Sequence, residues 1–298
     1  MCYKMFLKER KLRFYVLNCL RWVPDILMIK IQYRIKTGRW PHLKHPKRFT
    51  EKLQLYKMKY RNPVIHKCID KYEVRKFIES KGLKCTLNEI YGIYNSVEDI
   101  KLESLPDQFV VKSTLGSGGQ NVFVVSDKAT CNWNSIKRKV SSWLKIRNIG
   151  ANYGREWGYS GLSPRIIVER YLGDKNGLID YKFFCFNGEP KFLYVLSDRK
   201  MGKSVKLGIY DVGFNKLNTY RCDEVKDERE VEKPLNYERM LDVARILSSD
   251  FPHVRIDLYN IEGNIYFGEM TFYDGSGYFG YDPDEFDFQV GAWFTEYC

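Results

Sequence analysis

One stretch near the middle of the chain constrains the fold more than any other: FVVKSTLGSGGQNV, residues 109–122. Its first three residues are aromatic and β-branched, which is typical of a strand, and residues 122–125 resume the same pattern. Glycines lie between the two runs, so the backbone can turn there and its N–H groups can approach a ligand oxygen. The stretch therefore predicts a hairpin with a glycine-rich tip.

This hairpin has two interpretations. Lys112 ends the first strand as a positive point charge suited to phosphate, and a glycine-rich loop follows it. The spacing matches neither the Walker loop nor the dinucleotide-binding glycine motif. From these residues alone, a phosphate-binding loop and a plain hairpin with a glycine–serine tip are equally good. The choice depends on the rest of the chain.

Length and composition allow a substantial core. The chain has 298 residues, of which 44% are hydrophobic and 15% aromatic, enough for one large lobe or two to three small ones. The eight cysteines are scattered without a C-x-x-C pair, and the two neighbouring histidines, His42 and His45, have no cysteine nearby. This pattern argues against a zinc or redox motif and favours reduced thiols in the cytosol.

The charge is concentrated at the start of the chain. Residues 1–61 contain 17 Lys and Arg against 3 Asp and Glu, so the whole net charge of +12 comes from this fifth of the sequence. A uniformly basic protein would suggest nucleic acid, which is not expected here. A basic end on a near-neutral body suggests a local contact with a membrane or another anionic partner. A second charged segment, residues 221–233, is expected to face solvent.

Residues 1–48 mix basic side chains with short apolar runs. Charges interrupt these runs, and none approaches the ~20 apolar residues of a membrane span. No apolar region leads to a small-residue cleavage site, so a signal peptide is not expected. Two interpretations remain: helices that lie on an anionic leaflet, or helices that pack on the body with basic outer faces. We favour the second interpretation slightly. We expect a cytoplasmic protein, and the alternative is a peripheral position at the inner membrane face.

The second informative stretch is HVRIDLYNIEGNIYFGEMT, residues 253–271. It alternates like a strand, turns at a glycine and returns. Arg255 and Asp257 then lie on one face, and Glu269 and Thr271 of the return strand can lie beside them on that face. Two carboxylates on adjacent strands repel each other unless a cation lies between them. Oxygen ligands of this kind suit Mg²⁺. The alternative, a solvated carboxylate pair matched by Arg255, is equally well supported by these residues.

Five short motifs occur in order along the chain. They are DKYEVR at 70–75, VVKSTLGSGG at 110–119, ERYL at 169–172, DYKFFCFNGEP at 180–190, and RIDLY with GEMTF within 255–272. In this order they resemble the ATP-grasp fold, and more closely its TupA-like branch, named for teichuronopeptide biosynthesis. The resemblance runs from about Phe49 to Phe294. Each motif alone is weak, but five in the right order are specific.

The resemblance implies an α+β fold of the ATP-grasp type, in which two lobes with antiparallel sheets clamp ATP. A basic helical N-terminal segment would precede them. The implied domains are this segment at 1–48, a pre-ATP-grasp region at 49–105, a small lobe at 106–170, and a large lobe with the metal site at 171–298.

The resemblance also implies a nucleotide site. Lys71 and Lys112 would contact the phosphates of ATP, and a loop would close over them that comprises Gly116, Ser117, Gly118 and Gly119. A linker would lie along adenine, partly through its backbone, and it comprises Glu169, Arg170, Tyr171 and Leu172. Asp180 would bind the ribose hydroxyls, with Lys182 close by.

The implied metal and catalytic residues lie in the second hairpin. Asp257 and Glu269 would hold Mg²⁺, and Arg255 would stabilise the transferring phosphoryl group or a tetrahedral intermediate. Many members of the family have Asn where this chain has Thr271, so the third metal ligand would be a hydroxyl. The following residues, YDGSG at 273–277, are either an acceptor or phosphate loop or a plain turn.

The implied reaction is carboxylate activation. ATP phosphorylates a carboxylate to give an acylphosphate, and an amine then displaces phosphate to form an amide. The branch is associated with bacterial surface polysaccharides, which suggests a glycan or lipid-linked glycan carboxylate and an amino acid as substrates. A kinase on the same fold remains an alternative. A glycosyltransferase is another, since Asp282-Pro283-Asp284 has the D-x-D pattern, although no strand is expected before it.

Overall fold

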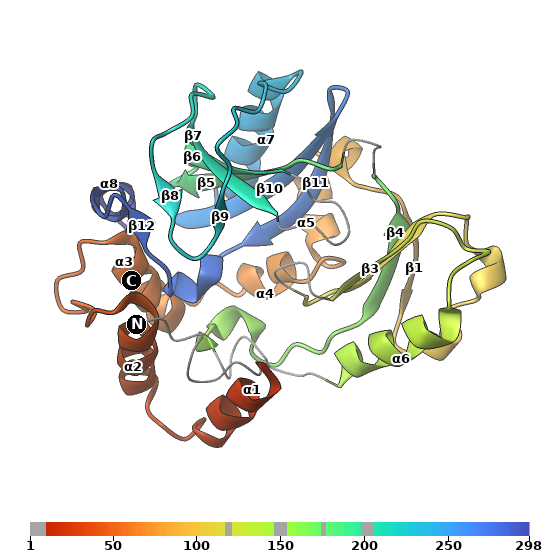
Figure 1. Ribbon diagram of the computed structural model, residues 1–298, viewed down its shortest axis with the longest axis horizontal. Helices are drawn as coiled ribbons and strands as arrows, with labels where there is room; N and C mark the ends of the chain where they lie inside the picture. The colour runs from red at the N-terminus through yellow and green to blue at the C-terminus, as the bar shows by residue number, and fades with distance from the viewer. Residues whose placement is uncertain (1–9, 117–120, 146–153, 174–176, 198–204, 298) are drawn as a thin grey trace.

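The computed structural model describes all residues except 1–9, 117–120, 146–153, 174–176, 198–204 and 298. Within the described residues, helices surround a four-stranded and a six-stranded sheet, and two short strands pair separately (Figure 1). Almost all the strand pairs are antiparallel, the exception being a short parallel pairing at one edge. This mixture of helices and antiparallel sheets is the predicted α+β architecture.

The four-stranded sheet contains the predicted glycine hairpin. Its strands, in spatial order, are β1 (Ile90–Tyr94), β4 (Ile166–Arg170), β2 (Phe109–Ser113) and β3 (Val122–Val125). Helix α6 (Trp133–Leu144) packs on one face through Ile136, Val140 and Trp143. The pairing of β2 with β3 confirms the hairpin, whose tip at 117–120 lies outside the described residues.

The six-stranded sheet contains the predicted acidic hairpin. Its order is β11 (Asn264–Thr271), β10 (His253–Ile261), β5 (Asp180–Phe186), β6 (Glu189–Ser197), β7 (Lys206–Asp211) and β9 (Val225–Lys226). Helix α7 (Tyr237–Ser248) covers one face, where Cys185 contacts Ala244 and the ring of Phe183 packs on Tyr237. Because side chains alternate along a strand, Lys182 and Asp257 project from the other face.

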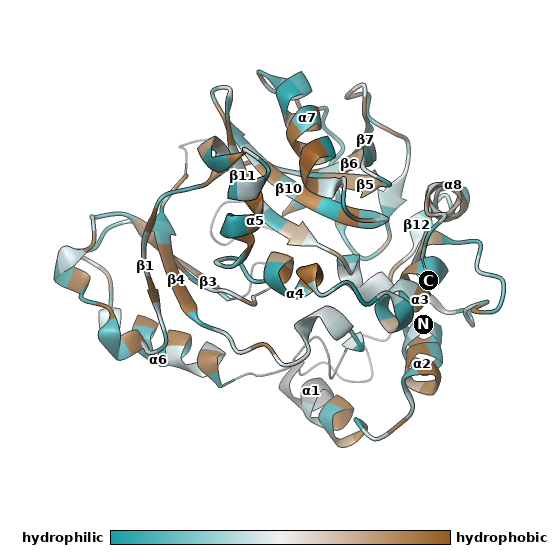
Figure 2. Ribbon diagram, turned by 180° about the vertical axis from the view of Figure 1, so that it is seen from behind, coloured by the Kyte–Doolittle hydropathy of each residue, from teal (hydrophilic) through white to brown (hydrophobic). Residues whose placement is uncertain are grey.

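The remaining helices are α1 (Arg10–Cys19), α2 (Asp25–Thr37), α3 (Phe49–Lys59), α4 (Val64–Ile69), α5 (Val74–Ser80) and α8 (Glu285–Trp293). Of these, α3, α4, α5 and α8 contribute to the core of the six-stranded sheet, whereas α1 and α2 lie at the periphery (Figure 2). The short elements are η2 (Lys84–Thr86), η3 (Val97–Asp99), η4 (Leu102–Ser104), η6 (Trp157–Tyr159), β8 (Tyr220–Arg221), η7 (Asp274–Gly277) and β12 (Tyr281–Asp282). No helix in the described part of the chain is both long and apolar enough to span a membrane.

The two sheets have separate hydrophobic cores. The smaller core joins the four-stranded sheet to α6, and the larger one joins the six-stranded sheet to α3, α4, α5, α7 and α8. Phe49 at the start of α3 is fully buried in the larger core, where its ring meets Phe184, Phe186 and Phe294. Figure 1 shows α4 and α5 between the sheets, so the segment that joins them can contact both. The domain boundaries given above stay predictions.

Candidate active site

Lys71 connects the two sheets. It lies between α4 and α5, where the carboxylate of Asp70 accepts hydrogen bonds from the backbone N–H groups of Tyr72 and Glu73 at 2.8 and 3.0 Å and fixes the turn. The Lys71 ammonium donates to the carbonyl oxygen of Gly116, at the end of the glycine hairpin, and lies 3.2 Å from Glu269 Oε2 on β11. The predicted phosphate-binding lysine therefore stands between the glycine loop and the acidic hairpin.

Lys112 and Glu169 form an ion pair on the four-stranded sheet. Lys112 on β2 donates to Glu169 Oε2 on the neighbouring strand β4 at 2.6 Å. Lys112 is partly exposed and Glu169 is buried. The structure thus brings together two residues to which the resemblance assigns different parts of ATP, the phosphates and the adenine.

The predicted adenine linker leaves β4 toward the six-stranded sheet. Arg170 ends β4, and its guanidinium donates to the hydroxyl of Tyr266 on β11 at 3.1 Å. Its carbonyl accepts a hydrogen bond from Asn88 at 2.8 Å. Tyr171 and Leu172 follow as half-buried residues. The linker therefore lies at the junction of the two sheets, whereas Ser117, Gly118 and Gly119 of the predicted loop lie outside the described residues.

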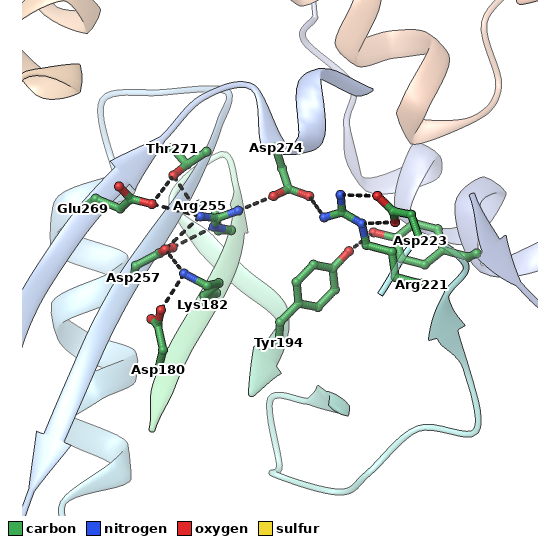
Figure 3. Close-up of polar contacts among 11 residues, drawn as sticks. Asp180, Lys182, Tyr194, Arg221, Asp223, Arg255, Asp257, Glu269, Thr271 and Asp274 are labelled. Atoms are coloured by element: carbon green, nitrogen blue, oxygen red, sulfur yellow. Dashed lines mark hydrogen bonds and ion pairs between the residues drawn. The ribbon is translucent and has the colours of Figure 1, made fainter. Parts of the chain in front are cut away.

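The acidic hairpin carries a buried ionic network (Figure 3). Asp257 on β10 and Glu269 on β11 are register partners, which confirms the predicted side-by-side placement. Arg255 binds both oxygens of Asp257 through Nε at 2.7 Å and Nη2 at 2.8 Å, and Nη2 also meets Thr271 Oγ1 at 3.0 Å and Glu269 Oε1 at 3.3 Å. Lys182 on β5 pairs with Asp257 and lies 2.8 Å from Asp180.

The pKa values of the two carboxyl groups in the hairpin are shifted in opposite directions. Burial raises the pKa of Asp257 to about 6, although Arg255 and Lys182 oppose this shift. Burial also acts on Glu269, but the positive charges of Lys71, Lys182 and Arg255 outweigh it and lower the pKa of this carboxyl. Glu269 is therefore ionised over the whole neutral range, and Asp257 is the group of the pair that takes up a proton first.

The donor set of the hairpin fits a Mg²⁺ ion. Asp257, Glu269 and Thr271 offer only oxygen atoms, and Mg²⁺ takes such ligands from one or two carboxylates together with phosphate oxygens and water. Within the described residues, no group of three or more His, Cys, Asp or Glu side chains is arranged to hold a metal ion. The protein thus offers a two-carboxylate site that nucleotide phosphates would complete.

Asp274 and Arg221 belong to the same network; Arg221 was missed as a site residue, and Asp274 was predicted only as part of a candidate acceptor or phosphate loop. Asp274 is buried and accepts hydrogen bonds from Arg255 Nη1 and, at 2.9 Å, from Arg221 Nη1. Burial raises the pKa of Asp274, but the two arginines outweigh it and the net shift is downward. The expectation that residues 221–233 face solvent is wrong for Arg221, which is buried and packs over the ring of Phe279. The glycine-rich stretch after β11 marked the region of Asp274 in the sequence, whereas no sequence pattern marked Arg221.

The turn that carries Asp274 is supported by a buried lysine. Lys57 on α3 is fully buried and donates to the carbonyl oxygens of Ser276 at 2.7 Å and Gly154 at 3.0 Å. Burial lowers the pKa of Lys57 to about 7. Gly275 and Gly277 have φ angles of +49° and +68°, which favour glycine. The turn at 274–277 is therefore a fixed structure that places Asp274 against Arg255.

The D-x-D pattern does not form a metal site. Asp284 lies 2.6 Å from Arg39 and 2.7 Å from Arg48, and Asp282 accepts a hydrogen bond from the Tyr220 hydroxyl at 2.5 Å. The expectation that no strand precedes this pattern is wrong, because Asp282 ends the two-residue strand β12, which pairs with β8. The contacts of Asp284 tie the C-terminal part of the chain to the segment between α2 and α3.

Comparisons with known proteins identify related sequences and folds. A family described as TupA-like ATPgrasp matches residues 51–295 of the chain. No curated protein matches it significantly. Solved structures that resemble it include D-alanine–D-alanine ligase from Bacillus anthracis, at 18% identity and a TM-score of 0.41 over 69% of this chain and 57% of that one.

Two further solved structures are similar at the same level. L-amino acid ligase from Bacillus licheniformis has 15% identity and a TM-score of 0.41 over 70% of this chain and 42% of that one. N5-carboxyaminoimidazole synthetase from Staphylococcus aureus, complexed with ADP, has 15% identity and a TM-score of 0.40 over 74% of this chain and 50% of that one. The chain spans about half the length of these solved proteins.

Proposed function

The chain belongs to the TupA-like ATP-grasp family, and from that premise we propose that it is an ATP-dependent ligase that joins a carboxylate to an amine, with Mg²⁺ as its metal cofactor. The observation that carries the proposal is the position of Lys71. Its ammonium reaches both the end of the glycine hairpin and Glu269 of the acidic hairpin. A triphosphate bound at this junction would meet backbone N–H groups, ammonium groups and paired acids together.

The lysines can exchange their present partners for phosphate. Lys71, Lys112 and Lys182 each pair with a carboxylate: Glu269, Glu169 and Asp257. An ammonium group binds a phosphate oxygen as readily as a carboxylate oxygen, so the three lysines stay paired when a nucleotide takes the place of the carboxylates. The carboxylates of Asp257 and Glu269 then become available to a Mg²⁺ ion, which would neutralise charge on the phosphates.

Arg255 is suited to the transition state because it is held rigidly. Asp257 holds its Nε and Nη2 atoms and Asp274 holds Nη1, while Nη2 also contacts Glu269 and Thr271. A fixed guanidinium can stabilise charge that develops on the transferring phosphoryl group without reorganising. The γ-phosphoryl group of ATP moves to the substrate carboxylate and ADP leaves. The amine nitrogen then attacks the acyl carbon, loses a proton, and inorganic phosphate leaves.

We infer the substrate from the family and the charge of the chain. A uronic-acid carboxylate of a bacterial surface or capsular polysaccharide, joined to an amino acid, fits the reaction. The basic start of the chain suits a lipid-diphosphate-linked form of such a glycan. This substrate would place the enzyme in the cytoplasm, peripherally at the inner membrane face.

The reaction can be tested without the natural amine. Purified protein is incubated with ATP, Mg²⁺, a glucuronic-acid oligosaccharide and hydroxylamine, a small amine that converts an acylphosphate to a hydroxamate. A ligase releases ADP and inorganic phosphate in equal amounts and forms hydroxamate. ADP with a stable phosphorylated glycan would instead identify a kinase. If a UDP-sugar raised the melting temperature and ATP with Mg²⁺ did not, the protein would be a glycosyltransferase and neither a ligase nor a kinase.

A further inference from the structure

Two rows of side chains on α2 point away from the protein. Leu27, Ile31 and Ile35 are four residues apart, and their exposed fractions are 48%, 37% and 44%. Lys30 and Arg34, also exposed, form a second row beside them. Residues four apart lie on the same face of a helix, so α2 presents an apolar stripe next to a positive stripe. We refer to these five residues as the α2 outer face.

Exposed apolar side chains are concentrated around this face. Of the eleven large hydrophobic side chains that are exposed in the described part of the chain, seven lie between residues 15 and 40. Trp22 and Trp40, exposed by 77% and 59%, lie before and after α2. Figure 2 shows α1 and α2 at the periphery of the molecule, with hydrophobic residues on both. A cluster of this kind on a protein surface indicates an interaction site.

The opposite side of α2 is anchored to the body. Met28, Ile29 and Tyr33 are buried, and the Tyr33 hydroxyl lies 2.9 Å from Thr50 Oγ1 on α3. The start of the helix is held by Arg155, whose guanidinium donates to the carboxylate of Asp25 at 2.9 Å and to carbonyl oxygens of the turn before it. The α2 outer face is therefore presented in a fixed orientation.

We propose that the α2 outer face docks on an anionic lipid leaflet. This proposal deepens the proposed function, because it names the surface on which the substrate of the ligase would lie. Only the identity of that substrate rests on the proposed function. The occupant must offer hydrocarbon to three apolar side chains and negative charge to Lys30 and Arg34. A leaflet offers both, and tryptophans at the ends of an interfacial helix lie at headgroup depth. A second copy of the chain would bring two strongly basic surfaces together.

Vesicle co-sedimentation tests this surface. The full chain is spun with vesicles of phosphatidylcholine alone and of phosphatidylcholine with phosphatidylserine, at low and physiological salt. We expect binding to the anionic vesicles only. The triple variant Leu27→Ser/Ile31→Ser/Ile35→Ser should bind about tenfold more weakly or worse at both salt concentrations. The double variant Lys30→Glu/Arg34→Glu should lose about tenfold, most clearly at low salt.

The matched control removes equally exposed apolar side chains elsewhere. Val212→Ser/Val225→Ser/Leu235→Ser changes three such residues outside the N-terminal helices and should bind as the parent does. Equal binding by the parent and the α2 triple variant, or no binding by the parent, would overturn the proposal. A parent dimer that the triple variant makes monomeric would also overturn it. ATP-dependent hydroxamate formation, assayed without vesicles, reports separately on the proposed function.

Discussion

The ionic groups of the two sheets are arranged differently. On the four-stranded sheet, the partly exposed Lys112 forms one ion pair with the buried Glu169. On the six-stranded sheet, Arg255 contacts three carboxylates, those of Asp257, Glu269 and Asp274, and is itself buried. A single pair with a partly exposed cation costs less to separate than a buried network, in which the loss of one member leaves several charges without a partner. We infer that Lys112 of the proposed site can exchange its carboxylate for a ligand, and that the proposed metal site on the second sheet is coupled to folding.

Arg255→Ala should produce the largest effect and test this contrast directly. It leaves the carboxylates of Asp257 and Asp274 buried without their shared guanidinium, so we expect a loss of about 3–5 kcal/mol in the free energy of unfolding. Urea denaturation measures it. Arg255→Lys restores one charge but not the forked geometry, and should recover only part of the loss. A loss below about 1 kcal/mol for the alanine variant would mean that the network does not couple the site to folding.

Lys112→Ala is the counterpart on the other sheet. The free energy of unfolding should fall by about 1–3 kcal/mol, less than for Arg255→Ala, because the buried Glu169 loses one partner and no shared guanidinium is removed. If Lys112 binds phosphate, kcat/KM for ATP should fall by about 10²–10³, the range seen when one charge-stabilising group is removed. Lys128→Ala, which alters another lysine of the same sheet region whose ammonium donates to Leu105, is the control and should leave kcat/KM unchanged. A stable, fully active Lys112→Ala enzyme would contradict the phosphate role.

The parts of the site that were predictable from sequence are local. The acidic hairpin follows from alternation of apolar and polar residues around one turn. The pairing of Asp257 with Glu269 also needs the register shift between Asp257 and Leu258, which alternation alone does not predict. Lys71 was predicted by family resemblance, since its own segment favoured a solvated lysine. Its contacts with both sheets depend on how three distant segments pack, which no local pattern encodes.

The Arg221–Asp274 contact shows more clearly what local sequence patterns cannot predict. These residues are 53 positions apart, and Arg221 opens a segment whose charge density is typical of a solvated loop. Its burial depends on the ring of Phe279 below it and on Asp223 and Asp274 beside it. Lys57 is a similar case, because a lysine in a helix is ordinarily exposed and here lies fully inside the protein.

His253 should make the six-stranded sheet sensitive to acid. This histidine is fully buried at the start of β10, where burial lowers its pKa from 6.5 to about 4. The unfolded chain binds a proton below pH 6.5 and the folded chain does not until about pH 4, so stability is present above pH 6.5 and lost as the pH falls toward 4. The loss amounts to about 3 kcal/mol.

His253→Phe separates this titration from the other acidic effects. The variant keeps an aromatic ring against Phe186 but cannot be protonated, so its unfolding free energy should fall less between pH 6.5 and 4 than that of the parent. His42→Phe, which changes an exposed histidine, is the control and should follow the parent curve. Parallel curves for the parent and His253→Phe would show that His253 titrates normally in the folded protein.

Gly275→Ala should have the smallest effect and test how tightly the turn holds Arg221. Gly275 has a φ angle of +49°, and an added Cβ would lie 2.5 Å from Arg221 Nη2, so the guanidinium must move. Gly161→Ala is the matched control, because Gly161 has φ +76° but an added Cβ would meet no atom within 4 Å. Both variants incur about 1 kcal/mol of backbone strain, and the excess for Gly275→Ala measures the displacement of Arg221 and of Phe279, whose ring would lie 2.8 Å from the added Cβ. We expect that excess to be about 1 kcal/mol in unfolding free energy. We also expect kcat to fall at unchanged KM for ATP, because Arg221 holds Asp274 and Asp274 holds Arg255. Equal losses in the two variants would mean that Arg221 moves aside freely, and the second arginine would then have no part in positioning the first.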